Sequence, residues 1–140
     1  MATARAHARI AEDPEVVWAL VSDPMAIVKW GMGMSAATWD ADTDTRTITL
    51  DSGATVRERV VTTNNDLRRF QYEVLPDEGT GIERHLATAD VLDDTEGSLL
   101  IWSVDVKPDA AGPFMQKMAT RIIQTLTAYL EAQRAQGGDR

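Results

Sequence analysis

An arginine, a glutamate, a tyrosine and a histidine are the residues of this chain best placed to do chemistry. Arg46, Glu58, Tyr72 and His85 each alternate with apolar residues along a predicted strand, which puts all four on the apolar face of a sheet. A polar group buried on such a face costs free energy unless it is paired or used. A histidine or glutamate there can take a proton from the carbon next to a carbonyl group, while an arginine or tyrosine stabilises the enolate oxygen.

The register of Arg46 and Glu58 follows from the turn between their strands. Asp51-Ser52-Gly53 is a three-residue loop with glycine last, which is typical of a type I turn followed by a bulge and pairs Leu50 with Ala54. Counting back two residues at a time places Arg46 opposite Glu58. A slip of one residue would expose two valines of the second strand, so we expect this register to hold.

All four residues also have a purely structural interpretation. Arg46 and Glu58 can form a cross-strand ion pair that only holds the register. Tyr72 can point its hydroxyl group toward water at a cavity mouth, and His85 can be a hydrogen-bonded histidine of the core or its rim. If the ion pair is tight, Arg46 lowers the pKa of Glu58, and His85 becomes the preferred base. The other histidine, His7, falls on the charged face of its strand and is expected at the surface.

A long amphipathic helix is expected at the end of the chain, from about residue 113 to residue 134. Pro113 suits its first position, where a missing N–H costs nothing, and Gly137 and Gly138 end it. A helix of this length spans on the order of 30 Å and needs a large partner. Its apolar residues recur at steps of three and four, and they are Phe114, Met115, Met118, Ile122, Ile123, Leu126, Tyr129 and Leu130.

Nearly all of the chain before this helix is predicted to form short antiparallel strands. Alternation of small and charged residues predicts the first strand over residues 4–10. Asp13-Pro14-Glu15 and Ser22-Asp23-Pro24 each combine the cap and the proline that begin a helix, and the second of these short helices ends near Trp30. Clusters of Asp, Asn, Gly and Pro separate the other strands, which are expected over residues 36–40, 45–50, 54–62, 68–75, 83–92 and 98–106.

These elements predict an α+β fold: a curved seven-stranded antiparallel sheet wrapped around a long C-terminal helix, with two short helices after the first strand. A chain of 140 residues is expected to form a single domain over residues 1–140. The formal net charge of -8 opposes binding to nucleic acid and to anionic membranes. There is no cysteine and no run of 18 apolar residues, so we expect a cytoplasmic protein without disulfides or membrane insertion.

Cofactor and metal motifs are missing or out of context. The stretch from Gly31 to Ala36 has the letters of a dinucleotide-binding fingerprint, but a helix precedes it and a strand follows, the reverse of what that fingerprint needs. The Asp-rich turn at residues 40–44 lacks the glycine and the glutamate of a calcium-binding EF-hand. We therefore expect no cofactor and no metal. Met32 and Met34 instead suit the lip of a cavity for an apolar ligand.

Several stretches together match one known superfamily: Pro14–Asp23, Trp30, Arg46–Leu50 with Gly53, Val56–Arg59, Tyr72 and Ile101–Ser103. With the order of elements, they resemble the START-like or helix-grip superfamily known as SRPBCC, and within it the polyketide cyclase/dehydratase-like branch. The resemblance covers nearly the whole chain. It implies a deep cavity between the sheet and the long helix, closed near the two short helices. His85 stands where relatives often carry a tyrosine.

Two main interpretations of function remain open. The first is a binding or carrier protein, in which the four polar residues orient a small hydrophobic ligand, aromatic or polyketide-like. The second is a cofactor-independent cyclase, dehydratase or isomerase. By the resemblance, Arg46 and Tyr72 would then hold polyketide oxygens, with Glu58 or His85 as the base. A protein-interaction domain, the third interpretation, would instead expose an apolar patch.

In the first two interpretations the chain acts as a monomer or a homodimer, and its partner is a small hydrophobic molecule. The residues expected to contact the ligand are Trp30, Met32, Met34, Phe70, Trp102, Met118 and Ile122.

Overall fold

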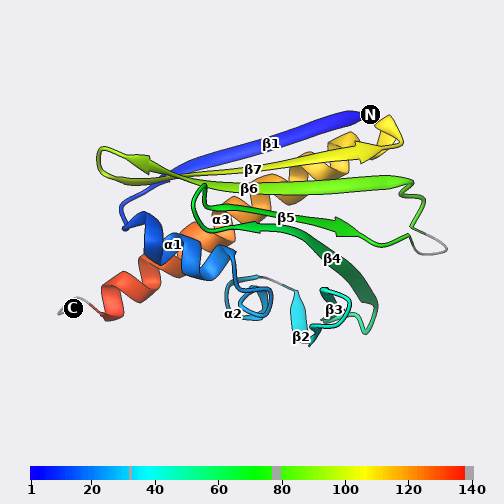
Figure 1. Cartoon of the computed structure of the whole chain (residues 1–140), viewed down its shortest axis with the longest axis horizontal. Coiled ribbons are helices and arrows are strands. Elements are labelled where there is room, and N and C mark those ends of the chain that lie inside the picture. Colours follow the sequence, from blue (N-terminus) through cyan, green and yellow to red (C-terminus); the bar gives the residue numbers. More distant parts are fainter. Residues whose placement is uncertain (32, 77–79, 138–140) are drawn as a thin grey trace.

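One curved antiparallel sheet and one long helix make up most of the structure (Figure 1). The computed structural model describes residues 1–31, 33–76 and 80–137. The strands follow the order β1-β7-β6-β5-β4-β3-β2, so that β1 and β2 are the two edges of the sheet. Their bounds are β1 (Ala2–Ile10), β2 (Met34–Asp40), β3 (Thr45–Leu50), β4 (Thr55–Asn64), β5 (Arg69–Val74), β6 (Arg84–Asp94) and β7 (Gly97–Lys107).

The helices are α1 (Pro14–Val21), α2 (Ile27–Trp30) and α3 (Gly112–Gln136), with a short 3-10 helix, η1 (Asp109–Ala111), before α3. The predicted α+β fold and the order of its elements are confirmed. The start of α1 is as expected, because the Asp13 carboxylate accepts the backbone N–H of Glu15 at 2.8 Å. The second helix is shorter than expected, because residues 24–26 form a turn rather than its first residues.

The predicted register of β3 and β4 is confirmed. The backbone N–H of Leu50 donates to the carbonyl of Ala54 at 2.8 Å, and Arg46 lies opposite Glu58. Gly53 in the turn has a φ of 90°, a conformation that favours glycine. Because the turn fixes the register, both charges point to the inner face of the sheet.

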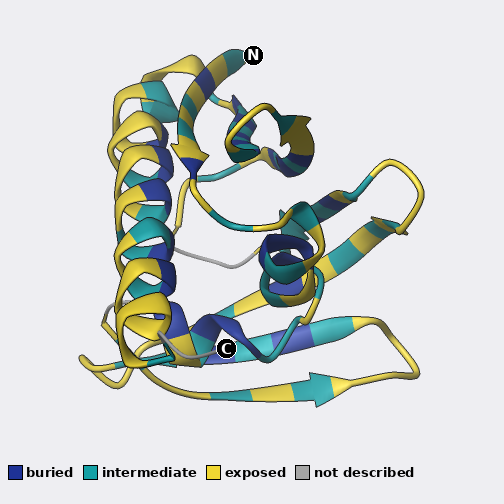
Figure 2. Ribbon diagram, turned by 90° about the vertical axis from the view of Figure 1, so that its left-hand side faces the viewer, coloured by how far each residue is buried: buried dark blue, intermediate teal, exposed yellow. Residues whose placement is uncertain are grey.

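The helix α3 covers one half of that inner face, where it contacts β1 and β7. Figure 2 shows its buried residues toward the sheet and its exposed residues on the opposite side. The prediction that Phe114 belongs to the apolar side that packs on the sheet was wrong. Phe114 is 59% exposed, because it lies in the first turn of α3, to one side of the row of buried residues. That row recurs at steps of four and three and consists of Met115, Ala119, Ile123, Leu126 and Leu130.

The helices α1 and α2 cover the inner face beyond α3. The contacts of α1 are with β6 and β7, and those of α2 are with β2 and α3. Val17, Val21 and Ile27 of this helical pair are at least 97% buried, and so is Ala26 in the turn between the two helices. This pair therefore closes the side of the sheet that carries the predicted polar residues.

The free edge of β1 is protected by a side chain of α3. The Gln116 amide oxygen accepts the backbone N–H of Arg5 at 3.0 Å, and its nitrogen donates to the Arg5 carbonyl at 2.8 Å. One glutamine thus occupies both backbone groups, as a neighbouring strand would.

Candidate functional site

A buried arginine is the centre of the predicted site. Arg46 is 2% exposed, and its Nε donates to Oε1 of Glu58 at 2.7 Å. Its Nη1 also donates to the carbonyl of Pro24 at 3.0 Å. Arg46 therefore connects β3 and β4 to the turn between α1 and α2. Because two of its nitrogens are occupied in this way, Arg46 holds these three segments together.

Aromatic rings complete the surroundings of the arginine. The guanidinium carbon lies 4.9 Å from the centroid of the Tyr72 ring and 6.0 Å from that of Phe70. A cation over an aromatic face is stabilised by the ring's electron density. The positive charge is thus balanced by Glu58 and further stabilised by the Tyr72 ring, which makes a buried arginine tolerable here.

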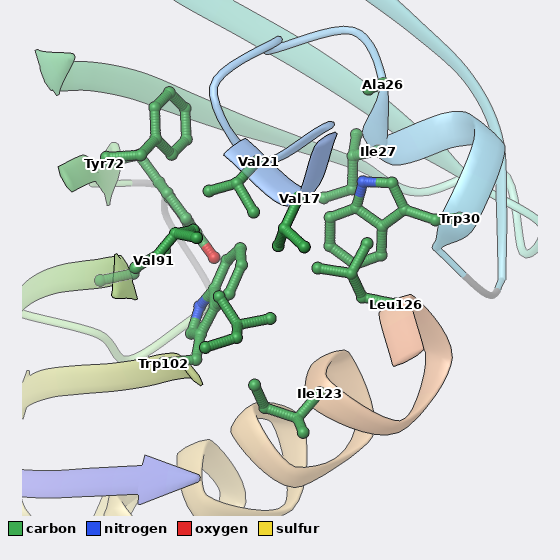
Figure 3. Packing of buried hydrophobic residues seen from close by; sticks show 14 of the residues in the cluster. Val17, Val21, Ala26, Ile27, Trp30, Tyr72, Val91, Trp102, Ile123 and Leu126 are labelled. Atoms are coloured by element: carbon green, nitrogen blue, oxygen red, sulfur yellow. The ribbon is translucent and has the colours of Figure 1, made fainter. Parts of the chain in front are cut away.

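The hydroxyl group of Tyr72 stays protonated in this environment. Tyr72 is 4% exposed, and burial raises its pKa above the usual value, with a further rise from the negative charge of Glu58. Figure 3 shows the hydroxyl group directed toward the indole nitrogen of Trp102. Tyr72 is therefore suited to donate a hydrogen bond to a ligand oxygen, and not to act as a phenolate.

His85 is also neutral, and its tautomer follows from one contact. The backbone N–H of Val74 donates to Nδ1 of His85 at 3.1 Å, so the proton of the neutral ring is on Nε2. Burial lowers the pKa of His85 to about 4. The ring centroid is 5.9 Å from that of Tyr72. With Nδ1 occupied and a low pKa, this geometry favours hydrogen-bond donation over proton abstraction.

Two tryptophans form the apolar wall beside Tyr72. The rings of Trp30 and Trp102 meet edge to face, with centroids 6.0 Å apart and an interplanar angle of 67° (Figure 3). In the described part of the chain, the indole N–H of Trp30 has no hydrogen-bond partner, although its nitrogen is buried. The indole N–H of Trp102 is also buried and faces the hydroxyl oxygen of Tyr72, a contact that lowers the pKa of that hydroxyl and partly offsets the effect of burial. The indole nitrogen of Trp18, by contrast, donates to Oδ1 of Asn65 at 3.0 Å. Such unpartnered buried donors are rare in native structures.

A protein-family model described as polyketide cyclase / dehydrase and lipid transport matches residues 1–133. The chain belongs to this family. The resemblance predicted from the sequence is therefore confirmed, and the family suggests a ligand-binding or cyclase function. No curated protein matches the chain.

Solved structures of similar shape support the same fold for this family member. XoxI from Bacillus cereus is 22% identical, with a TM-score of 0.83 over 95% of this chain and 99% of that chain. An uncharacterised protein from Bacillus thuringiensis is 20% identical, with a TM-score of 0.81 over 92% of this chain and 99% of that chain. A protein from Thermobifida fusca is 25% identical, with a TM-score of 0.77 over 98% of this chain and 96% of that chain.

The ligand-contacting residues predicted for this family member lie at different depths. Phe70 and Trp102 are at least 98% buried, and Trp30 is 6% exposed. Met34 and Ile122 are half-buried and lie against the core. Met118 is half-buried on α3, and Met32 lies outside the described residues.

Figure 3 shows Val17 of α1 and Leu126 of α3 beside the two tryptophans. Trp30 also lines an open groove of about 890 Å³ along α3, but the other predicted residues do not. The remaining lining of this groove comes from α3 alone: Gln116, Lys117, Thr120, Arg121, Gln124, Thr125, Ala128 and Tyr129. Trp30 therefore stands between the groove and the buried cluster.

Residues that the sequence reasoning missed also shape the site. Val17 and Val21 of α1 face the aromatic cluster (Figure 3), and the carbonyl of Pro24 holds Arg46. The helix-start signal at Ser22-Asp23-Pro24 predicted where the turn between α1 and α2 lies in the sequence. It did not predict that this turn contacts β3.

Within residues 1–31, 33–76 and 80–137, no group of three or more His, Asp or Glu side chains could hold a metal ion. In the same ranges no helix is long and apolar enough to cross a membrane.

Proposed function

We propose that this chain binds a small neutral hydrophobic molecule on the inner face of the sheet, with its polar end at the cluster around Arg46. The observation that carries the proposal is the buried indole N–H of Trp30, which has no acceptor among the described residues. A buried donor without an acceptor costs on the order of 1–3 kcal/mol. An oxygen of a bound ligand would supply the missing acceptor, and the protonated hydroxyl group of Tyr72 would add another donor.

Half-buried apolar side chains support the hydrophobic part of this proposal. Val56 and Val60 share the inner face with Glu58 by their register, and both keep some exposure to solvent. Met118 and Ile122 of α3 are half-buried as well. A ligand that covered these side chains would gain free energy by removing apolar surface from water.

The ion pair supports a neutral ligand. The charge of Arg46 is already balanced by Glu58 at 2.7 Å. A ligand carboxylate buried in this cluster would therefore meet no unpaired cation, and its desolvation would be costly. A carbonyl, ether or hydroxyl oxygen fits the available donors without that cost.

Native mass spectrometry of protein purified gently from its own host tests the proposal. We expect one molecule of a neutral hydrophobic compound per chain, and its loss in Trp30→Phe, which removes an unpartnered donor. Trp18→Phe is the matched control, since the Trp18 nitrogen already has a partner in Asn65. Protein that carries nothing, and that also gains no mass from a panel of neutral apolar compounds, would contradict the proposal.

Catalysis is the second candidate, and the neutral Tyr72 beside Arg46 favours it. A hydroxyl group that stays protonated can donate to a carbonyl oxygen while a substrate closes a ring or loses water. In this case the bound compound changes mass during incubation, and Tyr72→Phe stops the change while binding persists. A bound mass that is constant over days would instead identify a carrier.

A further inference from the structure

The outer face of the sheet carries an apolar hollow that the proposed inner site does not use. The volume of the hollow is about 510 Å³, and two of its side chains, Met1 and Val61, are 60% and 54% exposed. Its other apolar walls are Val74, Leu75, Pro76 and Leu86. Elsewhere on this face, neighbouring strands are joined by polar contacts, namely Arg69 with Asp90, Thr62 with Gln71 and Gln71 with Thr88. The apolar hollow is thus a local exception on a polar face.

The hollow lies where β5 and β6 separate. Their pairing ends at Tyr72 opposite Ala87, whereas β5 stays paired with β4 as far as Val74, and β6 stays paired with β7 as far as Arg84. In the gap, the backbone N–H of Val74 donates to the His85 imidazole. A side chain therefore takes the place of the next backbone acceptor.

The imidazole of His85 lies between the outer hollow and the inner aromatic cluster. It lines the outer hollow, and on the inner side its ring centroid is 5.9 Å from that of Tyr72. His85 is only 9% exposed, so the ring fills the gap between the strands. A molecule in the hollow would touch the same ring that contacts the inner cluster.

We infer that this hollow is a second binding site, for a small neutral apolar molecule, with His85 as the wall that it shares with the inner site. Its volume falls in the range of about 300–1,000 Å³ that is typical of small-molecule sites. Two of the charged groups that line it are already engaged, because Arg59 forms an ion pair with Glu73. Asp105, on the same lining, accepts the hydroxyl group of Thr3 at 2.5 Å. The other charged side chains of the lining, Glu83 and Arg84, carry opposite charges. Together these groups favour an uncharged occupant.

Methyl NMR of protein labelled at isoleucine, leucine and valine tests the inference, with the neutral dye N-phenyl-1-naphthylamine as the probe. The methyl groups of Val61 and Leu86 report on the outer hollow, and those of Ile122 report on the inner site. We expect the dye to shift the signals of Val61 and Leu86. Leu86→Asn should weaken that binding about tenfold by removing apolar contact area. Leu92→Asn is the matched control, since Leu92 is 41% exposed on the same face of β6 but does not line the hollow.

Each outcome separates the two sites. If the dye shifts the signals of Ile122 alone, the second site is overturned and the proposed inner site stands. If it shifts those of Val61 and Leu86 alone, the second site stands and the inner site does not bind the dye. Equal weakening by the two asparagine substitutions would also overturn the inference. A dimer detected by sedimentation would also overturn the inference if its formation shifts the signals of Val61 and Leu86 without dye. A second copy of the chain would then cover the hollow.

The shared wall has its own readout. The ring signal of His85 should move with that of Leu86 as the dye is added, while the signal of His7, an exposed residue of β1, stays fixed. A His85 signal that does not respond at saturating dye would refute the shared wall.

Discussion

The two halves of the inner face are covered by different kinds of contact. Over β1 and β7, the helix α3 buries an apolar row, and Leu126 at its centre is fully buried. Over β3 to β5, the turn between α1 and α2 is held by Arg46, which bonds to Glu58 and to the carbonyl of Pro24. The first half depends on packed area, and the second depends on matched charges and hydrogen bonds.

This difference decides how each half responds to change. Loss of an apolar side chain leaves a cavity, whose cost depends on how far its neighbours relax. Loss of one member of a buried ion pair leaves an unpaired charge, which is more costly than replacement of both members. The polar half is therefore the more sensitive one. The proposed ligand site lies where the two halves meet, because Tyr72 belongs to β5 and Trp102 to β7.

The largest effect is expected from breaking the ion pair. Glu58→Leu should lower the free energy of unfolding by about 4 kcal/mol, because it leaves the charge of Arg46 buried without a partner. The double variant Glu58→Leu with Arg46→Met should recover most of that loss. Urea unfolding at pH 7 measures all three proteins. If the double variant were as unstable as the sum of its single variants, the two residues would not act as a pair.

In the apolar half, Leu126→Ala should cost about 3 kcal/mol in the same measurement, since Leu126 is fully buried. Gln124→Ala, at an exposed position of the same helix, is the control and should stay within about 0.5 kcal/mol of the parent protein. Combined with Glu58→Leu, the cost of Leu126→Ala should be additive if the two halves are independent. Strong coupling would show that they form one unit.

The polar half should also respond to pH through His85. Its pKa is about 4 in the folded protein and about 6.5 in an unfolded chain, so only the unfolded state takes up this proton between those values. The resulting stabilisation is complete above about pH 6.5 and is lost as the pH falls to 4, a total of roughly 3 kcal/mol.

Comparison with His85→Gln isolates this contribution, because the carboxylates titrate in both proteins. We expect the stability difference between the two proteins to shrink in that pH window. His7→Gln, at the exposed histidine, should show no such change. A difference that is constant from pH 7 to pH 4 would mean that His85 protonates as easily in the folded state as in the unfolded one.

Sequence patterns predicted which residues face each other within a hairpin, but not the contacts between elements that are distant in the sequence. The pairing of Arg46 with Glu58 followed from one turn, because strand register is a local property. The bond from Arg46 to Pro24 depends on where the α1–α2 turn lies over the sheet, and no local signal encodes that placement. The contact of Val74 with His85 likewise requires the separation of β5 from β6.

Burial along the long helix was predicted well in its middle and less well at its start. Periodicity identified Ile123 and Leu126, which are buried, but it also included Phe114, which is exposed. Periodicity identifies the apolar side of a helix, but how much of that side the sheet covers depends on the tertiary structure. The unpartnered indole N–H of Trp30 could not be predicted either, since hydrogen-bond partners depend on the packed core.

The smallest effect is expected at the edge of the apolar half. Gln116→Ala removes both hydrogen bonds to the backbone of Arg5 and should cost about 1 kcal/mol, because these groups are exposed and water replaces part of the loss. The uncovered edge of β1 should also pair with other chains, so the variant should aggregate faster on heating. Gln124→Ala is a control, since it removes an exposed polar side chain of the same helix and leaves Gln116 in place. Equal stability and equal aggregation of the two variants would show that the edge needs no cover, and that packing of α3 alone secures β1.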